Sequence, residues 1–594
     1  MANRYWVGGT AAWDGTAGTK WALTSGGAGG QAVPTSADDV FFSSLSTGTC
    51  TISTGNTGAK SINCTGFTGA LAGGTSISVA GSITLSTGMT LNFFAAFVIT
   101  GTGTFTSAGK IPAIVSVNGS GITVSLGSAL TLLDFGTFLH SSGTLNLNGF
   151  TLSTGSFSSS GSTARAITFG TANIALISTT AAATVLDMAN ASNFTYTGTG
   201  GFTRNMAATA TVVFGTSGAT SSNAPNLTVN AGASALTITS VSRFKNLTFT
   251  GSTCSAAGSA FLYGNLTLAS GGTYTALSPT FLTGTTFNSL GKTLASLGID
   301  ATGFSITLGG AATVSGTTTL TRGVLDLSGF TLTTGVFSSS ASTVRAVSFG
   351  SGNIALIGTG TVLNMNVATN FTYTGTGGFT RNMAATATVI FGPASGSITN
   401  APNLIINAGA SALTIIGNSW FNNLIFTGST STVTSSNVNI AGNLTLASGG
   451  TYTALPTTYR DTGILTSAGK TLSALTVDGS GITVTCADAL TLTNALTFTL
   501  GTLNLKDGVT STVGSLVTTG TTLKYLESTT PGSQATISDA SGTNTVTYLS
   551  VQDSNATGGA VFDASDPTNV NVSNNTGWLG FGGGDNGSFI AFFM

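Results

Sequence analysis

Short runs of alternating apolar and polar residues, broken by glycine and asparagine, extend along most of the chain. In GTLNLNGFTL, residues 143–152, leucines alternate with Thr and Asn until an Asn-Gly pair interrupts the run. Side chains of a β-strand point alternately to opposite faces, so this pattern predicts a short strand with one buried face, followed by a turn. We expect Phe150 and Leu152 to return to the buried side after that turn.

The alternation recurs with its inward positions kept apolar. GVLDLSGFTL begins at Gly323 and GTLNLKDGVT at Gly501, and Phe330 occupies the position of Phe150 in the second copy, where we also expect it to point inward. The outward residues change between copies, as they do on a strand with one solvated face. No long stretch has the apolar spacing of an amphipathic helix. The sequence therefore predicts an all-β protein built from many short strands.

Longer repeats show how the strands are organised. The stretch Asn193–Gly215 returns at Asn370–Gly392 with a single change, Ile390 in place of Val213. Segments that open alike define repeat units at 107–288 and 289–466, with partial units at 60–106 and 467–524. We interpret the chain as three regions: a Trp-rich cap or attachment region at 1–59, a repetitive solenoid at 60–524, and C-terminal coils with an apolar tail at 525–594.

A stack of coils fits these repeats better than a sandwich or a propeller does. The array tolerates spacers of unequal length and ends in partial units on both sides, and its outward residues are Thr, Ser and Asn. Stacked repeats behave in this way because each contacts only its neighbours. We therefore predict a right-handed parallel β-helix (β-solenoid) of about 25 coils, each roughly 20 residues long, with a cap at both ends.

Composition and charge narrow the chemistry. The net charge is −1, only 6% of the residues are charged, and 41% are apolar. A nucleic-acid-binding protein needs a cationic surface that displaces counterions, so we expect no nucleic-acid partner. A single histidine and four cysteines without a CxxC pair do not supply a structural zinc site. We expect no cofactor and no bound metal.

The cysteines and the apolar runs add two expectations. We expect the cysteines to be buried thiols, with a disulfide between Cys50 and Cys64 on neighbouring strands as the alternative. The opening residues MANRYWVGG lack the apolar core of a secretory signal. The densest apolar run, Leu91–Ile99, is far too short for a membrane-spanning helix. We expect synthesis in the cytoplasm without membrane insertion.

Large apolar residues gather at the two ends of the chain. Three of the five tryptophans, Trp6, Trp13 and Trp21, lie near the start, where they either cap the first coil or form a docking surface for a partner. For the C-terminal group we expect a subunit contact, because exposed apolar patches are rare on monomers, with folding over the last coil as the alternative. That group comprises Trp578, Phe581, Phe589, Ile590, Phe592 and Phe593.

Four arginines recur at equivalent places in the repeats. Arg165 and Arg345 occupy one position, and Arg204 and Arg381 another. Charged side chains usually lie on solvated faces, so we expect these arginines at exposed coil edges. A contact with a glycan or with another subunit is the alternative.

Carboxylates are too sparse to predict catalysis. Glycoside hydrolysis usually needs two carboxyl groups that face one groove. The densest acidic set is Asp539, Asp553, Asp563 and Asp566, in sequences typical of turns. A carboxylate pair or a calcium site is the alternative for that set. We predict that the protein is not an enzyme.

The ends of the chain also carry a resemblance to known proteins. The segment from RYWVGG to DDVFF, the coil GTLNLNGFTLSTG and the residues from Tyr548 to Phe581 resemble repeat-rich β-solenoid proteins of phage virions and of autotransporter-type adhesins. Without a signal peptide or a stretch long enough for a translocating barrel, the phage branch is favoured. This resemblance implies a virion fibre, spike or decoration protein, usually a homotrimer, that contacts other virion proteins and a host-surface glycan. The alternatives are a glycan-cleaving tailspike, and a bacterial adhesin or self-assembling extracellular filament.

Overall fold

The computed structural model describes most of the chain as short β-strands. The described residues are 2–13, 20–56, 58–230, 235–251, 253–393, 395–407, 412–428 and 432–581. They form a parallel β-solenoid of about 25 turns, which confirms the predicted fold class. No α-helix occurs among them, and so none that is long and apolar enough to cross a membrane.

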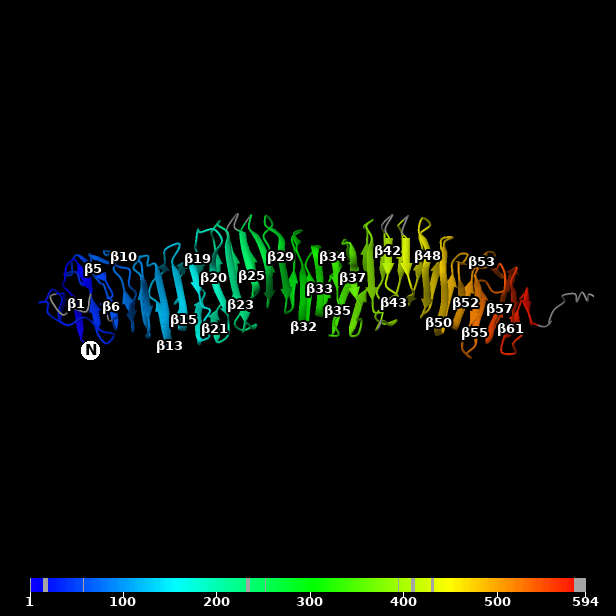
Figure 1. Cartoon of the computed structure of the whole chain (residues 1–594), viewed down its shortest axis with the longest axis horizontal. Helices are drawn as coiled ribbons and strands as arrows, with labels where there is room; N and C mark the ends of the chain where they lie inside the picture. The colour runs from blue at the N-terminus through cyan, green and yellow to red at the C-terminus, as the bar shows by residue number, and fades with distance from the viewer. Residues whose placement is uncertain are drawn as a thin grey trace, which may run out of the picture. The chain divides into compact units, whose positions relative to one another are not determined.

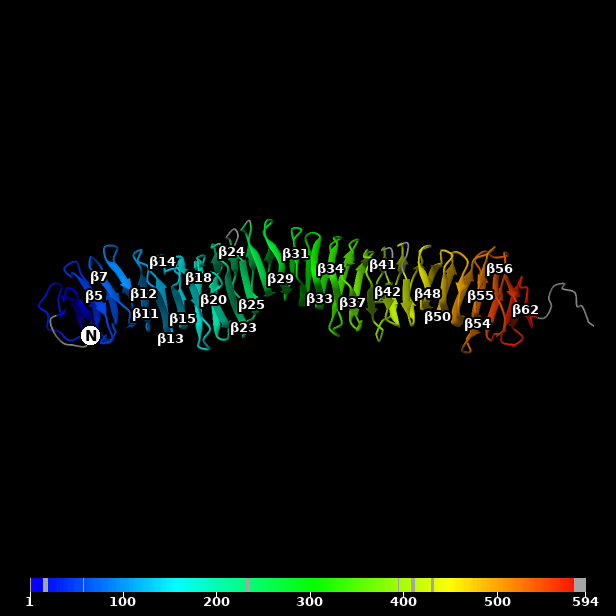
Figure 2. The same ribbon diagram turned by 45° about the horizontal axis from the view of Figure 1, so that its top comes forward.

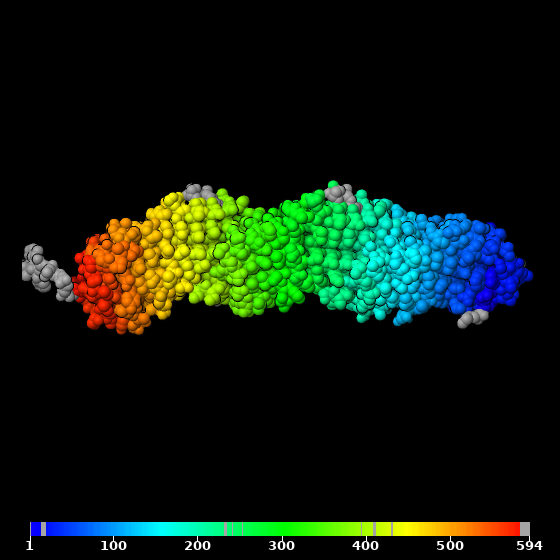
Figure 3. All heavy atoms as spheres, turned by 180° about the vertical axis from the view of Figure 1, so that it is seen from behind, coloured from blue at the N-terminus to red at the C-terminus, as the bar shows by residue number. Residues whose placement is uncertain are grey.

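The chain divides into two compact units. Unit 1 comprises Met1–Ala295 and unit 2 comprises Ser296–Met594. Within each unit the coils follow one another in chain order, and neighbouring coils lie side by side in both ribbon views (Figures 1 and 2). The space-filling view shows side chains closing the gaps between successive coils of each unit (Figure 3).

Unit 1 contains a seven-stranded sheet on which the candidate site lies. Its strands are parallel and in register, so that Leu227 pairs with Leu247 and Thr228 with Thr248. The first and third residues of each three-residue strand point inward, and the middle residue points outward. The strands are β14 (Leu130–Thr131), β16 (Leu152–Thr154), β19 (Ile174–Leu176), β22 (Phe202–Arg204), β24 (Leu227–Val229), β26 (Leu247–Phe249) and β28 (Leu266–Thr267).

Unit 2 repeats this arrangement with leucines at the corresponding inward positions. Leu404 pairs in register with Leu424, and Leu424 with Leu444. The corresponding strands are β36 (Ile354–Leu356), β39 (Phe379–Arg381), β41 (Leu404–Ile406), β44 (Leu424–Phe426) and β47 (Leu444–Thr445).

The interior is the predicted apolar stack, with one correction at the turns. Leu145, Leu147 and Leu152 are fully buried. Phe150, however, is only half-buried, and its counterpart Phe330 is 41% exposed, so the inward placement predicted for both is wrong. The residues before Phe150 adopt φ of 51° and 80°, and its N–H donates to the Leu147 carbonyl at 2.8 Å. Phe150 therefore belongs to the turn, where the strict alternation of a strand no longer applies.

A β-bulge recurs at one place in three coils. In the pairing of β13 (Ile114–Leu126) with β15 (Thr137–Asn146), extra residues loop out of β13 between Asn118 and Thr123. The same shift occurs in β32 (Leu297–Leu308) against β33 (Ala312–Asp326), and in β50 (Thr471–Cys486) against β52 (Ala495–Leu505). A glycine with φ near 70° lies in each loop, a conformation that other residues rarely adopt.

Candidate functional site: a polar groove on unit 1

A groove lined by neutral polar side chains lies on the outer face of the seven-stranded sheet. Its volume is about 330 Å³, within the range of small-molecule sites, which is roughly 300–1,000 Å³. We call it the polar groove. The lining residues are Asn173, Thr199, Gly201, Phe202, Asn226, Thr228, Asn246, Thr248, Asn265 and Thr267.

One side of the polar groove is an asparagine ladder. The Asn246 Nδ2 donates to Asn226 Oδ1 at 2.9 Å, and the backbone N–H of Asn265 donates to Asn246 Oδ1 at 2.8 Å. Upstream, the Gly201 N–H donates to Asn173 Oδ1 at 3.0 Å. These bonds fix the amide planes, while each side-chain NH₂ carries two donors and uses at most one of them in the ladder.

The other side is a column of threonines at the second positions of β24, β26 and β28. The hydroxyls of Thr228, Thr248 and Thr267 make no hydrogen bond within the described residues, and they face outward. No charged residue lines the groove; exposed Lys245 lies next to Asn246 in the chain but outside the lining. The groove thus presents fixed amides and free hydroxyls over successive coils.

Unit 2 contains a counterpart of this surface with two substitutions. Its asparagine ladder is kept: Asn423 Nδ2 donates to Asn403 Oδ1 at 2.8 Å, and the Asn443 N–H donates to Asn423 Oδ1 at 2.9 Å. Ile405 and Ile425 stand where unit 1 has Thr228 and Thr248, and the remaining lining residues are identical. Two free hydroxyls are therefore replaced by apolar groups.

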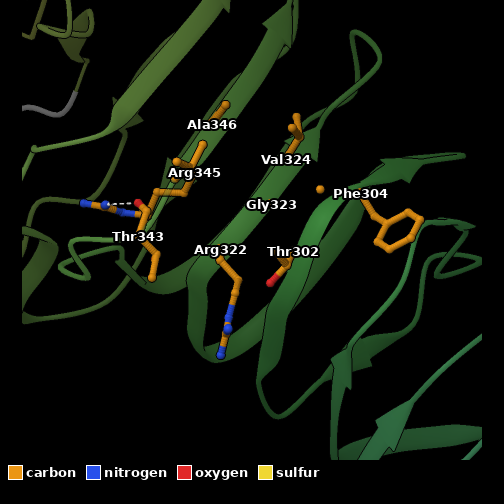
Figure 4. Close-up of a pocket in the computed structure, with 10 residues that line it drawn as sticks. Thr302, Phe304, Arg322, Gly323, Val324, Thr343, Arg345 and Ala346 are labelled. Atoms are coloured by element: carbon orange, nitrogen blue, oxygen red, sulfur yellow. Dashed lines mark hydrogen bonds between the residues drawn. The ribbon is translucent and has the colours of Figure 1, made fainter. Parts of the chain in front are cut away.

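A second kind of hollow, which we call the side pocket, occurs beside a bulge in each unit. In unit 2 its volume is about 360 Å³, and it is lined by residues that include Phe304, Gly323 and Arg345 (Figure 4). In unit 1 its volume is about 340 Å³ around Gly143 and Arg165. The Phe304 ring, 52% exposed, turns away from Arg345 (Figure 4). The pocket therefore stays open above the glycine.

The four repeated arginines are buried, so the expected solvent-exposed position is wrong. All four side chains are 0–2% exposed. Arg204 donates to the carbonyls of Leu176 and Ser178, both at 3.2 Å. Arg381 does the same to Leu356 at 3.2 Å and Gly358 at 3.1 Å. Burial lowers the pKa of each guanidinium. Backbone carbonyls of neighbouring coils and turns hold these charges.

The other arginine pair ties a turn to the next coil. Arg165 Nη2 donates to the carbonyls of Asn190 at 2.9 Å and Ser192 at 3.0 Å. Arg345 Nη1 donates to Thr369 at 3.0 Å, and its Nε to Ser339 Oγ at 2.7 Å. Each carbonyl group in such a loop needs a donor when buried, and one guanidinium supplies several.

Sequence reasoning missed a third cation at this position. Lys524 is 0% exposed. It lies beside Gly501 on the next coil, as Arg165 lies beside Gly143. Its Nζ donates to the Gly520 carbonyl at 3.0 Å and lies 5.6 Å from the Tyr548 ring. The signal was obscured because Lys524 lies one residue farther from Gly501 than Arg165 lies from Gly143, and because lysine replaces arginine there.

The tryptophans at the start form part of the core. Trp6, Trp13 and Trp21 are 0–1% exposed, and the Trp21 ring lies 5.1 Å from Trp6 and 4.9 Å from Trp13, edge to face. The strand β1 (Asn3–Trp6) pairs antiparallel with β3 (Trp21–Ala22) and parallel with β4 (Asp39–Phe41). These rings pack as the predicted cap does, and they do not form an exposed docking surface.

At the other end, Trp578 is covered by its own chain. It lies in β62 (Trp578–Leu579), is 8% exposed, and has the Phe562 ring at 5.4 Å and the Phe581 ring at 5.9 Å. Its Nε1 donates to Ser554 Oγ at 3.2 Å. Trp578 therefore folds over the last coil, which was the alternative to the expected subunit contact. Phe589, Ile590, Phe592 and Phe593 lie outside the described residues.

The acidic set serves turns, and the cysteines are free. Asp539 accepts from Asn544 Nδ2 at 2.9 Å, Asp553 from the Gly532 N–H at 2.8 Å, and the other two from nearby backbone N–H groups. Among the described residues, no three His, Cys, Asp or Glu side chains are placed to hold a metal ion. Cys50 and Cys64 are buried free thiols whose pKa burial raises, and they form no disulfide.

The polar groove carried a sequence signal that was not used. The tripeptide Asn-Leu-Thr occurs at 226–228, 246–248 and 265–267, one coil apart each time. Such spacing stacks like side chains on one face of a solenoid. Comparison with known proteins adds no further constraint: no protein-family model, no curated protein and no solved structure matches this chain.

Proposed function

We propose that the protein is a structural component of a phage virion, a fibre, spike or decoration protein that acts as a stiff spacer and binds a host surface. The supporting observation is a hydrogen-bonded parallel stack that repeats neutral polar side chains outward, coil after coil. Weak contacts multiply when such a surface repeats. The phage assignment itself rests on the resemblance of the chain ends and of the coil sequence.

The interior of each unit supports a spacer. Coils separated by about 4.8 Å make a unit of roughly a dozen coils ~60 Å long. Within a unit, buried arginines such as Arg204 and Arg381 tie consecutive coils through their carbonyls. Bending a unit at these coils would break such ties. On this proposal the chain self-associates, with a trimer implied by the resemblance.

Immunogold electron microscopy tests the proposal. Antibodies against the purified chain should label phage particles, and the purified chain should bind host cells with little dependence on salt, because few charges steer it. Label on bacterial surfaces or free filaments, with none on particles, would contradict the virion assignment. Release of defined oligosaccharides from host polysaccharide would replace it with the glycan-cleaving alternative.

A further inference from the structure

We infer that the polar groove of unit 1 is a binding site for a neutral glycan that lies along the direction of coil stacking. The inference rests on the proposed surface-binding role and adds the chemical class of the ligand. It is carried by three features of the groove: its uncharged lining, its closed backbone and its fixed ladder of side-chain amides.

The lining of the polar groove fits charged ligands and apolar ligands poorly. A polyanion or a cation would need opposite charges to replace its hydration, and the lining has none. An apolar ligand would leave the free hydroxyls of Thr228, Thr248 and Thr267 buried without partners, which is unfavourable for each of them. A polyhydroxylated ligand instead pairs its own hydroxyls with these groups and with the asparagine amides.

The backbone excludes recognition of a peptide by strand addition. β24 pairs on one side with β22 and on the other with β26, which itself pairs with β28. The groove lies on the face of these strands, and both edges of β24 and of β26 are already paired, so a peptide cannot extend either of them. Only side chains are available, and their amides and hydroxyls both donate and accept, as sugar hydroxyls do.

The ladder also sets the spacing of the donors. Asn226 and Asn246 are held by the bond between their side chains, and Asn265 follows one coil later. Coils repeat at about 4.8 Å, which is close to the advance of one residue in an extended hexopyranose chain. Because the amides are already fixed, binding costs little additional side-chain entropy. A glycan lying along the stack meets an equivalent amide and hydroxyl at each sugar.

Unit 2 supplies a natural variant of the site. With Ile405 and Ile425 at the threonine positions, its surface keeps the amides and loses the hydroxyls. Sites that pair a ligand hydroxyl discriminate strongly when the partner group is lost, because the ligand's polar groups then stay unpaired. We therefore expect unit 1 to bind the glycan and unit 2 to bind it at least tenfold more weakly.

The test uses the full chain and variants in which either the threonine pair of unit 1 or the isoleucine pair of unit 2 is substituted. The probes are neutral hexasaccharides of the α-glucan, β-glucan, mannan and galactan series, titrated by ligand-observed NMR. We expect at least one to bind with a dissociation constant of about 1 mM, as for a single weak site within a multivalent surface. Thr228→Ile with Thr248→Ile should weaken binding at least tenfold, and Thr228→Val with Thr248→Val should do the same with little change of shape.

The matched gain-of-function variant is Ile405→Thr with Ile425→Thr, which should raise the number of binding sites from one to two. Both exchanges introduce residues that the equivalent coil already accommodates, and unchanged circular dichroism checks folding. Absence of binding by every hexasaccharide, or binding unaffected by the threonine variants, overturns the inference. Stronger binding of dextran sulfate than of dextran also overturns it and assigns recognition to Lys245. The proposed virion role fails separately, by absence of the chain from particles, and glycan binding would survive that result.

Discussion

The two units share an interior and differ on the surface that a ligand would meet. The ties from Arg204 in unit 1 and from Arg381 in unit 2 run to equivalent carbonyls, and both asparagine ladders are intact. At the outward positions, however, unit 1 has Thr228 and Thr248 where unit 2 has isoleucines. An outward residue of a solenoid can change without disturbing the stack, because it packs against nothing that holds the coil. The duplicated units thus keep the same fold, while the residues on their outer face are free to change.

The largest expected effect tests whether the equivalent buried arginines contribute equally to the stability of the two units. Arg204→Met and Arg381→Met each leave several buried carbonyls without donors, and we expect each to lower the local free energy of unfolding by about 4 kcal/mol. Because repeat arrays rarely unfold in one step, the measurement is hydrogen exchange of the amides in the coils on either side. Equal losses in the two units are expected.

Arg322→Met is the control for that pair. Its guanidinium is 44% exposed and pairs with Asp300, so its loss should cost less than about 1 kcal/mol. A loss at Arg204 or Arg381 no larger than at Arg322 would contradict the view that buried cations hold the coils. A large loss in one unit alone would break the comparison between the units.

The next effect separates the units by pH. Burial and the nearby Arg165 lower the pKa of His140 in unit 1 to about 4, whereas Leu320 occupies the equivalent position in unit 2. An unfolded histidine takes up a proton below about pH 6.5, and the folded one only near pH 4. Stability from neutral His140 is therefore complete above pH 6.5 and falls as the pH decreases, by about 3 kcal/mol at pH 4.

Hydrogen exchange at pH 7 and pH 4.5 measures this difference. Amides around β15 should lose protection on acidification, while those around β33 should lose much less after correction for intrinsic exchange rates. His140→Leu copies the residue of unit 2 and should remove the excess acid sensitivity of unit 1. If the variant and the parent chain lose equal protection, another group is responsible for the acid response.

The sequence predicted the stack because alternation reports which side of a strand is buried. Leu145 and Leu327 lie inside, as the pattern requires. It misplaced Phe150 because a tight turn resets the alternation, and it misplaced Arg165 because composition alone says that a cation belongs in water. A cation can be buried without a carboxylate when several carbonyls of irregular loops converge on it. Such convergence depends on the coil path, which a single sequence does not reveal.

The candidate site was only partly accessible to sequence reasoning. The recurring Asn-Leu-Thr tripeptides indicate which residues stack, given the solenoid. The groove itself depends on the side-chain rotation of Asn226 and Asn246, which their mutual hydrogen bond decides. In unit 2 the ladder is intact while isoleucine stands at two of the outward positions, so the ladder alone does not decide how polar the neighbouring column is.

The smallest expected effect concerns the side pocket. Phe304 lies in the bulge of unit 2 and is 52% exposed, whereas Ile482 at the same place in the next repeat copy is 6% exposed and lies over Gly501. Phe304→Ile should let the shorter side chain fold over Gly323 in the same manner, as Ile122 also does over Gly143 in unit 1, where the hollow beside the arginine remains. Burying that side chain should raise the local free energy of unfolding by about 1 kcal/mol.

The reverse substitution is the matched control. Ile482→Phe should open the bulge of the third copy and lower the protection of the adjacent amides by a similar amount, since a Phe side chain does not fit the space above Gly501 that Ile482 fills. Hydrogen exchange of the two bulges, measured in the same pair of variants, should therefore change in opposite directions. Changes of the same sign would show that the exposure of Phe304 arises from the neighbouring coils rather than from the residue at the bulge.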